Sequence, residues 1–141
     1  MRIVIDASVA IKWVMRDALL EPDADKALAI LREIRAHTME VFEPPHWVAE
    51  ILAAIARARP QHIALTFGIL STLAFKETVQ PSCYRRAADI AIQYNHHLFD
   101  TLYHAVALEE GAMLVTADEV YFRKAEHLGA IELLSAFTPP A

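Results

Sequence analysis

The stretch RIVIDAS, residues 2–8, decides the fold that the rest of the sequence predicts. An Ile-Val-Ile run leads into Asp6, and small and apolar residues follow, which predicts a buried strand and then a helix over residues 8–15. Because the apolar run is continuous rather than alternating, it is typical of a strand covered on both faces in a parallel sheet. Ligands of such sheets bind beyond the carboxyl ends of the strands, and Asp6 stands at that edge.

Length and composition predict one domain with a sizeable core. The chain has 141 residues, of which 55% are hydrophobic. We expect a single domain over residues 1–137 and a loose tail over residues 138–141. The formal net charge of −5 argues against a broad basic surface for nucleic acid and against an anionic membrane as a partner, but it leaves room for a small acidic metal site.

Cysteine usage and hydropathy predict the compartment. Cys83 is the sole cysteine, so the chain has no internal disulfide and a reducing environment is expected. Charged residues interrupt the first apolar segment, and no apolar run reaches membrane-spanning length. These features predict a cytoplasmic protein without a membrane partner.

Hydrophobic periodicity, together with the prolines and glycines, divides the chain into alternating strands and helices. After the first strand, further strands are expected at residues 41–42, 77–80, 113–116 and 131–134. Helices are expected at residues 8–15, 23–37, 45–59, 61–75, 81–94, 98–110 and 118–128, with a connection at residues 16–22. About five short strands among about seven helices, mostly alternating, indicate an α/β fold with a central, mostly parallel sheet.

Two candidate site acids follow the two clearest buried strands. Asp6 ends the first strand, and Asp118 stands between the strand at residues 113–116 and the helix after it. Each is also consistent with an ordinary helix start, because an aspartate is a good N-cap and because Thr116 and Glu119 have the spacing of a capping box. Either residue taken alone leaves both interpretations open.

Two further acids lie in predicted helices. Glu50 shares a helix face with Trp47 and Ala53, so its carboxylate falls within an apolar helix and needs a cation or another partner. Pairing with Arg57, or exposure at the helix edge, is the alternative. Asp100 falls in the first turn of its helix, where the helix dipole favours a negative charge and capping is an alternative role.

The four acids are harder to explain together than one at a time. Carboxylates gathered at one edge of a sheet repel each other unless cations are bound there. Ligand sets made only of oxygen suit Mg²⁺ or Mn²⁺ rather than Zn²⁺. Without these four acids the net charge rises from −5 to −1, so the rest of the surface is nearly neutral. We therefore expect a divalent-metal site that supports hydrolysis of a phosphodiester.

The opening motif, VIDASVAIKW at residues 4–13, resembles that of PIN-domain proteins, especially the VapC-type toxins of bacterial and archaeal toxin–antitoxin pairs. The helix around Glu50 and the segments FDTLY (residues 99–103) and TAD (residues 116–118) are similar to the family's later acidic motifs, in the same order. The resemblance covers essentially the whole chain. One departure is Glu119, since many members of the family carry a basic residue after the last acid.

The resemblance implies a PIN-like three-layer domain and a Mg²⁺- or Mn²⁺-dependent endoribonuclease that acts on RNA, often tRNA or rRNA. It also implies a homodimer and a small cognate antitoxin whose C-terminal segment covers the site. By this resemblance, the catalytic, metal-binding residues are Asp6, Glu50, Asp100 and Asp118. The hydroxyls that support these acids, or contact water on the metal, are those of Ser8 and Thr116.

Phosphate contacts must come from sparse basic residues. Lys12, one helical turn beyond Ser8, is the strongest candidate for substrate binding. The other candidates, each of which is first explained as a solvated surface charge, are Arg57, Arg59, Arg85, Arg86, Arg123 and Lys124. The seven histidines show no metal-ligand spacing. His104 lies one turn after Asp100, but a packed or exposed histidine is the simpler interpretation.

Two other functions stay open. A catalytically idle PIN-like module would only bind a protein partner, and the presence of all four acids argues against it. A metal-dependent DNA nuclease would use the same acids, and the residues alone do not separate it from a ribonuclease.

Overall fold

One parallel sheet organises the computed structural model, which describes residues 1–15, 21–78 and 80–140. Within them the strands are β1 Arg2–Ile5, β2 Glu40–Glu43, β3 Phe75–Glu77, β4 Met113–Thr116 and β5 Ile131–Leu133. The strand order is β3-β2-β1-β4-β5, and all neighbouring strands pair in parallel. The expected α/β fold with a parallel sheet is confirmed.

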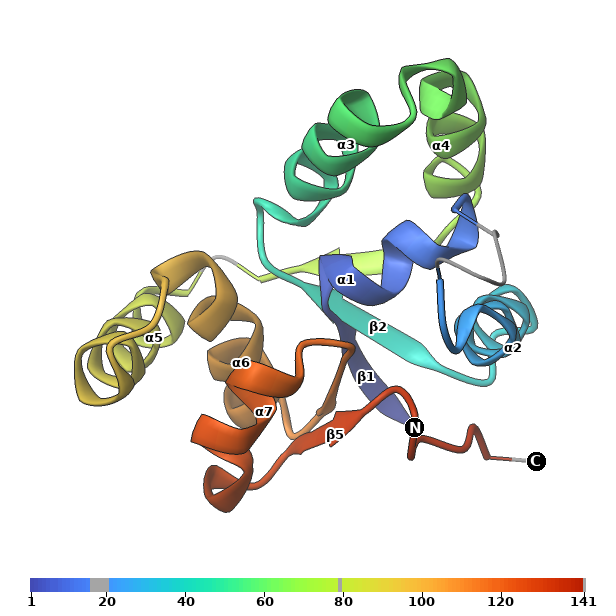
Figure 1. The fold of residues 1–141 in the computed structure, drawn as a ribbon. Coiled ribbons are helices and arrows are strands. Elements are labelled where there is room, and N and C mark those ends of the chain that lie inside the picture. Colours follow the sequence, from blue (N-terminus) through green and yellow to red (C-terminus); the bar gives the residue numbers. More distant parts are fainter. Residues whose placement is uncertain (16–20, 79, 141) are drawn as a thin grey trace.

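Helices cover both faces of this sheet. The α-helices are α1 Ala7–Ala10, α2 Ala24–Arg35, α3 Trp47–Ala58, α4 Ile63–Leu70, α5 Pro81–Tyr94, α6 Leu98–Glu110 and α7 Glu119–Ala125. Short 3-10 helices follow α1, α3 and α7, at Ile11–Trp13, Pro60–His62 and Glu126–Leu128. Figure 1 shows α1 to α4 on one side of the sheet and α5 to α7 on the other, which gives three layers. Among them, α6 packs against β1, β2 and β4, and α5 packs outside it.

The middle strand forms the centre of the core. Ile3, Val4 and Ile5 of β1 are each 0% exposed, because helices cover both faces of the sheet at this position. Trp13 and Trp47 meet edge to face beside the sheet, with ring centroids 6.3 Å apart. Their contact fixes the start of α3 against the segment that follows β1.

The segment after Pro60 differs from its prediction. The helix expected at residues 61–75 ends at Leu70, where Thr72 turns its hydroxyl back to the carbonyl of Ile69, 2.7 Å away. The strand expected at residues 77–80 is instead β3, which begins at Phe75. The predicted boundaries were wrong because apolar side chains that suit a helix stripe also suit a strand: the Phe75 ring packs 5.0 Å from the Trp47 ring.

Some predictions fall on residues that the structure does not describe. The connection expected at residues 16–22 lies mostly outside the described ranges, as do residue 79 of the expected strand and residue 141 of the expected tail. In the described part of the chain, no helix has both the length and the apolar character needed to cross a membrane.

Candidate metal centre

The carboxyl ends of β1 and β4 bring Asp6 and Asp118 close together. The two strands are neighbours in register, with Ile5 opposite Val115, and the Asp6 amide donates to the Val115 carbonyl at 3.1 Å. The chain leaves β1 for β2 on one side, and β4 lies on the other. Such a reversal of strand order opens a crevice at the carboxyl edge of a parallel sheet, where ligands bind.

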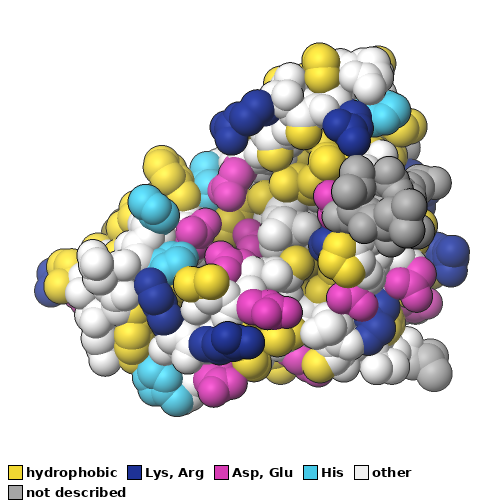
Figure 2. Space-filling view, viewed as in Figure 1, with side chains coloured by type: hydrophobic (Ala, Val, Ile, Leu, Met, Phe, Trp, Pro, Cys, Tyr) yellow, Lys and Arg dark blue, Asp and Glu magenta, His cyan; other side chains and the backbone are white. Residues whose placement is uncertain are grey.

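All four predicted acids line one pocket at this crevice. The pocket has a volume of about 360 Å³, and its charged lining residues are Asp6, Glu50, Arg57, Asp100 and Asp118. Figure 2 shows acidic side chains gathered in a hollow on the face that carries α1, with helices of both layers around it. The structure thus brings together the residue directly after β1, residues of α3 and α6, and the loop after β4.

Two hydroxyls hold the Asp6 carboxylate. Ser8 Oγ and Thr116 Oγ1 each donate to Asp6 Oδ2 at 2.7 Å. In turn Ser8 Oγ accepts from the Ala117 amide at 3.1 Å, and Thr116 Oγ1 accepts from the Asp118 amide at 3.0 Å. Asp6 occupies the N-cap position of α1, but its side chain makes no capping hydrogen bond to that helix among the described residues.

Burial raises the pKa of Asp6 from 3.8 to about 6. The hydrogen bonds from Thr116 and Ser8 lower that pKa, and the nearby carboxylates of Asp100 and Glu50 raise it further. A carboxyl with this pKa is half-protonated at about pH 6, because burial, with a further contribution from the neighbouring carboxylates, disfavours its charged form. Binding a divalent cation would therefore release a proton from this site.

Asp118 caps a helix and also lines the acidic pocket. Its Oδ1 accepts from the Tyr121 amide at 3.0 Å, so it is the N-cap of α7. The capping box suggested by Thr116 and Glu119 is wrong, because the cap is Asp118 and the Thr116 hydroxyl bonds to Asp6. Capping occupies one oxygen of this carboxylate, and Asp118 still lines the pocket.

Asp100 lies beside a histidine that the sequence did not single out. His96 Nε2 is 3.1 Å from Asp100 Oδ2, and Lys124 Nζ is 3.2 Å from His96 Nδ1. The Lys124 ammonium donates to Nδ1, which assigns the proton to Nε2 for donation to Asp100. Burial, followed by the charge of Glu50, raises the pKa of Asp100, and His96 opposes that rise.

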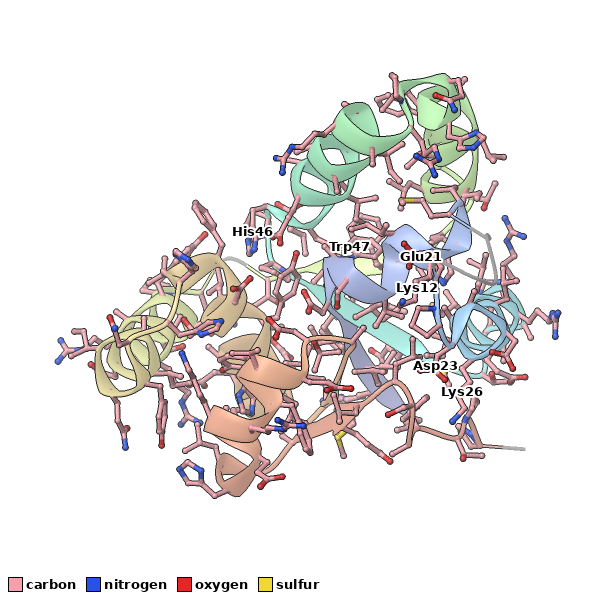
Figure 3. All side chains as sticks on the ribbon, viewed as in Figure 1. Lys12, Glu21, Asp23, Lys26, His46 and Trp47 are labelled. Carbon is pink, nitrogen blue, oxygen red and sulfur yellow. The ribbon has the colours of Figure 1, made fainter. Side chains whose placement is uncertain are left out.

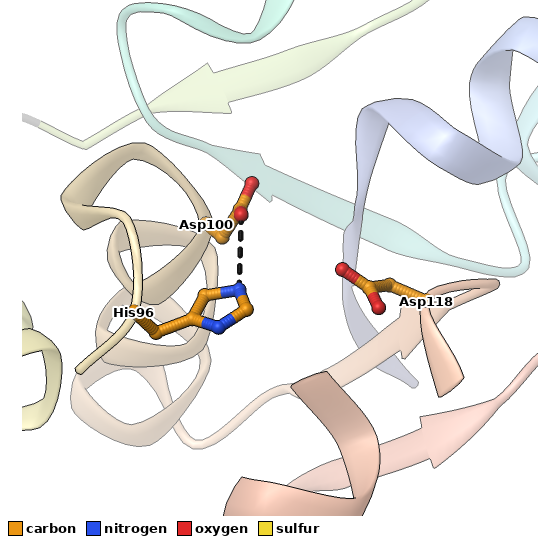
Figure 4. Close-up of side chains that lie close together, drawn as sticks. All are labelled: His96, Asp100 and Asp118. Carbon is orange, nitrogen blue, oxygen red and sulfur yellow. Dashed lines mark hydrogen bonds and ion pairs between the residues drawn. The ribbon is translucent and has the colours of Figure 1, made fainter. Parts of the chain in front are cut away.

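One ligand atom from each of His96, Asp100 and Asp118 lies within 4.8 Å of the others (Figure 4). The spacing of His96, four residues before Asp100 across a helix break, was the signal available in the sequence. Asp100 itself makes no cap to α6 among the described residues, so its capping interpretation is wrong.

Glu50 is more open than its apolar helix suggested. Its side chain is 35% exposed, and its Oε2 accepts from the Tyr103 hydroxyl at 2.9 Å and lies 3.2 Å from His46 Nε2. Burial, followed by the charge of Glu50, raises the pKa of Tyr103, so that phenol remains a donor. The described contacts of Glu50 include no ion pair with Arg57, although both residues line the pocket.

A fully buried acid of this region is Glu43, at the end of β2, which the sequence did not single out. Its side chain is 0% exposed, and its Oε1 accepts from the Ile5 amide at 2.8 Å. Its Oε2 has no hydrogen-bond partner among the described residues. Burial raises its pKa well above 4.5; the Ile5 hydrogen bond opposes that rise, and the charge of Asp6 adds to it. A charged residue directly after the apolar pair Val41-Phe42 was the available signal.

Lys12 lies elsewhere. It is 7% exposed, and its Nζ is 3.1 Å from Glu21 Oε2. Figure 3 shows the two side chains near each other. Lys12 does not line the acidic pocket, whereas Arg57 does. This placement does not support the predicted contact between Lys12 and phosphate.

His104 is a packed core residue. It is 0% exposed, with Nδ1 2.9 Å from the Tyr121 hydroxyl and Nε2 2.8 Å from the Gly129 carbonyl. Burial lowers its pKa, which keeps the imidazole neutral. The interpretation of His104 as a packed histidine is confirmed.

The donors at the pocket fit a hard divalent cation. Four carboxylates from separate elements converge, and two of them have raised pKa values because of burial and mutual repulsion. Carboxylate oxygens of this kind suit Mg²⁺ or Mn²⁺.

Comparison with known proteins identifies a matching family. A family model described as PIN domain matches residues 3–128. No curated protein matches the chain in sequence.

Several solved structures share the fold. VapBC2 from Rickettsia felis, bound to a DNA fragment from its promoter, is 15% identical over 94% of this chain and 97% of that chain, with a TM-score of 0.65. PAE2754 from Pyrobaculum aerophilum is 17% identical over 96% and 90%, with a TM-score of 0.62. FitAcB from Neisseria gonorrhoeae is 19% identical over 96% and 99%, with a TM-score of 0.64. At these identities the likeness shows the fold alone.

Proposed function

Because the chain belongs to the PIN domain family, a family of nucleases, we propose that it is a metal-dependent endoribonuclease that hydrolyses RNA phosphodiester bonds. The observation that carries this proposal is the convergence of Asp6, Glu50, Asp100 and Asp118 on one pocket. Those acids come from four separate parts of the chain. Four acids that only capped their own helices would have no reason to meet in one pocket.

The four carboxylates would hold Mg²⁺ or Mn²⁺. A cation bound among them supplies Lewis-acid activation of water and neutralises charge on the phosphate. It also allows an anionic backbone to approach an acidic pocket that would otherwise repel it.

The chain's own residues orient the site. Ser8 and Thr116 fix the rotamer of Asp6, and Tyr103 fixes that of Glu50, so the carboxylates are in place before the substrate arrives. Arg57 lines the same pocket from α3 and is the basic side chain best placed to contact a substrate phosphate.

We further propose that the protein is the toxin of a toxin–antitoxin pair, that it forms a homodimer, and that tRNA or rRNA is its substrate class. The VapC-type opening motif at residues 4–13 and the fold likeness to VapBC2 and FitAcB support this assignment. Co-expression with the product of a short adjacent reading frame should suppress cleavage if that product is the antitoxin.

A cleavage assay tests the nuclease proposal. Purified protein is incubated with single-stranded RNA, or with DNA of the same sequence, in Mg²⁺, Mn²⁺ or EDTA. We expect metal-dependent cleavage of RNA that Asp6→Asn abolishes and that Asp89→Asn, at an exposed ion pair on α5, leaves unchanged.

The other outcomes separate the alternatives. Cleavage of DNA alone would replace the ribonuclease with a DNA nuclease. Undiminished cleavage by folded Asp6→Asn would remove this site from the mechanism. Absence of any cleavage by the folded, metal-loaded protein would favour the idle binding module.

A further inference from the structure

A second pocket adjoins the acidic one. Its volume is about 440 Å³, and its lining residues are His46, Ala49, Glu50, His97, Phe99 and Asp100. Glu50 and Asp100 also line the acidic pocket, so the two spaces share a wall. We call this second space the aromatic pocket, because three of its six lining residues carry flat rings.

The rings of the aromatic pocket are partly fixed and partly open. His46 is held at the start of α3, with its Nε2 2.9 Å from the Phe99 carbonyl and 3.2 Å from Glu50 Oε2. Its ring lies 5.1 Å from the Phe99 ring, at a tilt of 52°. Phe99 itself is 61% exposed, although it is a large apolar side chain in the first turn of α6. Figure 2 shows histidine and hydrophobic side chains next to the acidic ones on this face.

We propose that the aromatic pocket binds an unpaired nucleobase of the nucleotide next to the scissile phosphate. This inference rests on the proposed ribonuclease function. The occupant of the acidic pocket would be a phosphodiester, whose neighbours on either side are nucleosides. The aromatic pocket shares Glu50 and Asp100 with the acidic pocket, so one of these two nucleosides can reach it.

The chemistry of the lining suits a base better than an aliphatic side chain. Bases in single-stranded RNA stack on aromatic and histidine rings, and their edges form hydrogen bonds with polar groups. Phe99 offers an exposed ring face, while His46 and His97 add imidazole nitrogens beside it. Double-stranded RNA keeps its bases stacked, so the substrate is expected to be cut in a loop or a single strand.

A double-mutant cycle, with one change in the protein and one in the RNA, tests the pocket. A short single-stranded RNA with one mapped cut is prepared in three forms: intact, and with an abasic ribose on either side of the cut. Single-turnover kcat/KM is measured for wild type, Phe99→Ala, Phe99→Tyr and Phe67→Ala. The last variant is a matched control, because Phe67 is 55% exposed on α4 and lines neither pocket.

We expect the abasic ribose on one side to lower kcat/KM about tenfold in wild type, Phe67→Ala and Phe99→Tyr. In Phe99→Ala the same change should cost about twofold or less, because the stacking partner is already absent. Unfolding temperature and Mn²⁺ affinity are measured for every variant, so that damage to α6 or to Asp100 is detected separately.

The remaining outcomes overturn the inference. Equal losses for Phe99→Ala and wild type at both positions would exclude a base in this pocket and leave the ribonuclease proposal standing. Loss of affinity for a protein partner in Phe99→Ala, with base sensitivity intact, would assign the pocket to that partner instead. A wild-type protein that cleaves no RNA would overturn the ribonuclease proposal and this inference with it.

Discussion

The Thr116 hydroxyl donates a 2.7 Å hydrogen bond to Asp6 Oδ2, although the two residues stand 110 positions apart in the chain. The bond joins the carboxyl ends of β4 and β1. Ser8 donates to the same oxygen at the same distance, so two hydroxyls fix one carboxylate. Orientation of a ligating carboxylate by fixed donors strengthens metal binding, because less order has to be created when the cation arrives.

Removing the Thr116 hydroxyl should weaken metal binding. We expect Thr116→Val to lower Mn²⁺ affinity at pH 7 by about tenfold, because outer hydrogen-bond partners of metal ligands typically contribute that much. In the wild type this hydrogen bond lowers the pKa of Asp6, so its loss raises that pKa and favours the protonated acid. Isothermal titration measures the affinity. Thr116→Ser keeps the hydroxyl and should bind nearly as wild type, and equal affinities for the Val and Ser variants would contradict the role assigned to this bond.

Metal affinity should depend steeply on pH around the pKa of Asp6. That pKa is about 6 without metal, so below pH 6 the cation must displace a proton, and well above pH 6 it does not. We expect Mn²⁺ affinity to rise about fivefold between pH 5 and pH 6 and to level off above about pH 7. Titrations in buffers of different ionisation enthalpy report the proton released. Constant affinity from pH 5 to pH 8 would show that Asp6 is not a ligand that titrates on binding.

Glu43 should make the protein less stable as the pH rises. Its pKa in the folded state is raised well above 4.5, so the folded state keeps a proton that the unfolded chain releases. The resulting contribution to stability is fully present below about pH 4 and is lost as the pH rises through the folded-state pKa. Glu43→Gln keeps an acceptor for the Ile5 amide without a titrating group, so its stability relative to wild type should increase between pH 4 and pH 8. Urea unfolding at both pH values measures the difference.

Glu43→Leu serves as the comparison for the same site. Relative to Glu43→Gln, it removes the acceptor of the buried Ile5 amide, which should cost about 1–3 kcal/mol of unfolding free energy at either pH. A difference between Glu43→Gln and wild type that does not change with pH would contradict the raised pKa of Glu43.

Substitution of Arg57 should affect substrate binding, whereas substitution of Lys12 should affect stability. Arg57 is exposed and lines the acidic pocket, so Arg57→Ala should weaken binding to RNA with little loss of stability. The slope of log affinity against log salt concentration should become shallower by about one. Lys12→Met leaves Glu21 without its buried partner and should destabilise the fold by about 1–3 kcal/mol without changing the affinity for RNA. Binding isotherms with an uncut RNA at several salt concentrations, alongside urea unfolding, compare the two. Weaker RNA binding by a folded Lys12→Met protein would restore the phosphate contact predicted for Lys12.

Local sequence patterns determined the frame of the protein. The Ile-Val-Ile run before Asp6 and the strand before Asp118 predicted two buried parallel strands that end in acids, and both are present. Gly111 was the expected end of a helix, and it follows α6 with a φ of 61°, a conformation that glycine adopts at low cost. Such features can be predicted from the sequence because each depends only on residues that lie close by in the chain.

Tertiary packing decided the contacts that cross between elements. The sequence did not predict that Glu43 would be fully buried, that His96 would lie beside Asp100, or that Lys12 would pair with Glu21 away from the acids. Periodicity specifies which face of a helix or strand is apolar, but the partner of a polar side chain depends on how separate elements pack. The sequence by itself therefore determined the sheet and its acidic edge, whereas the assembled fold decided which side chains hold those acids in place.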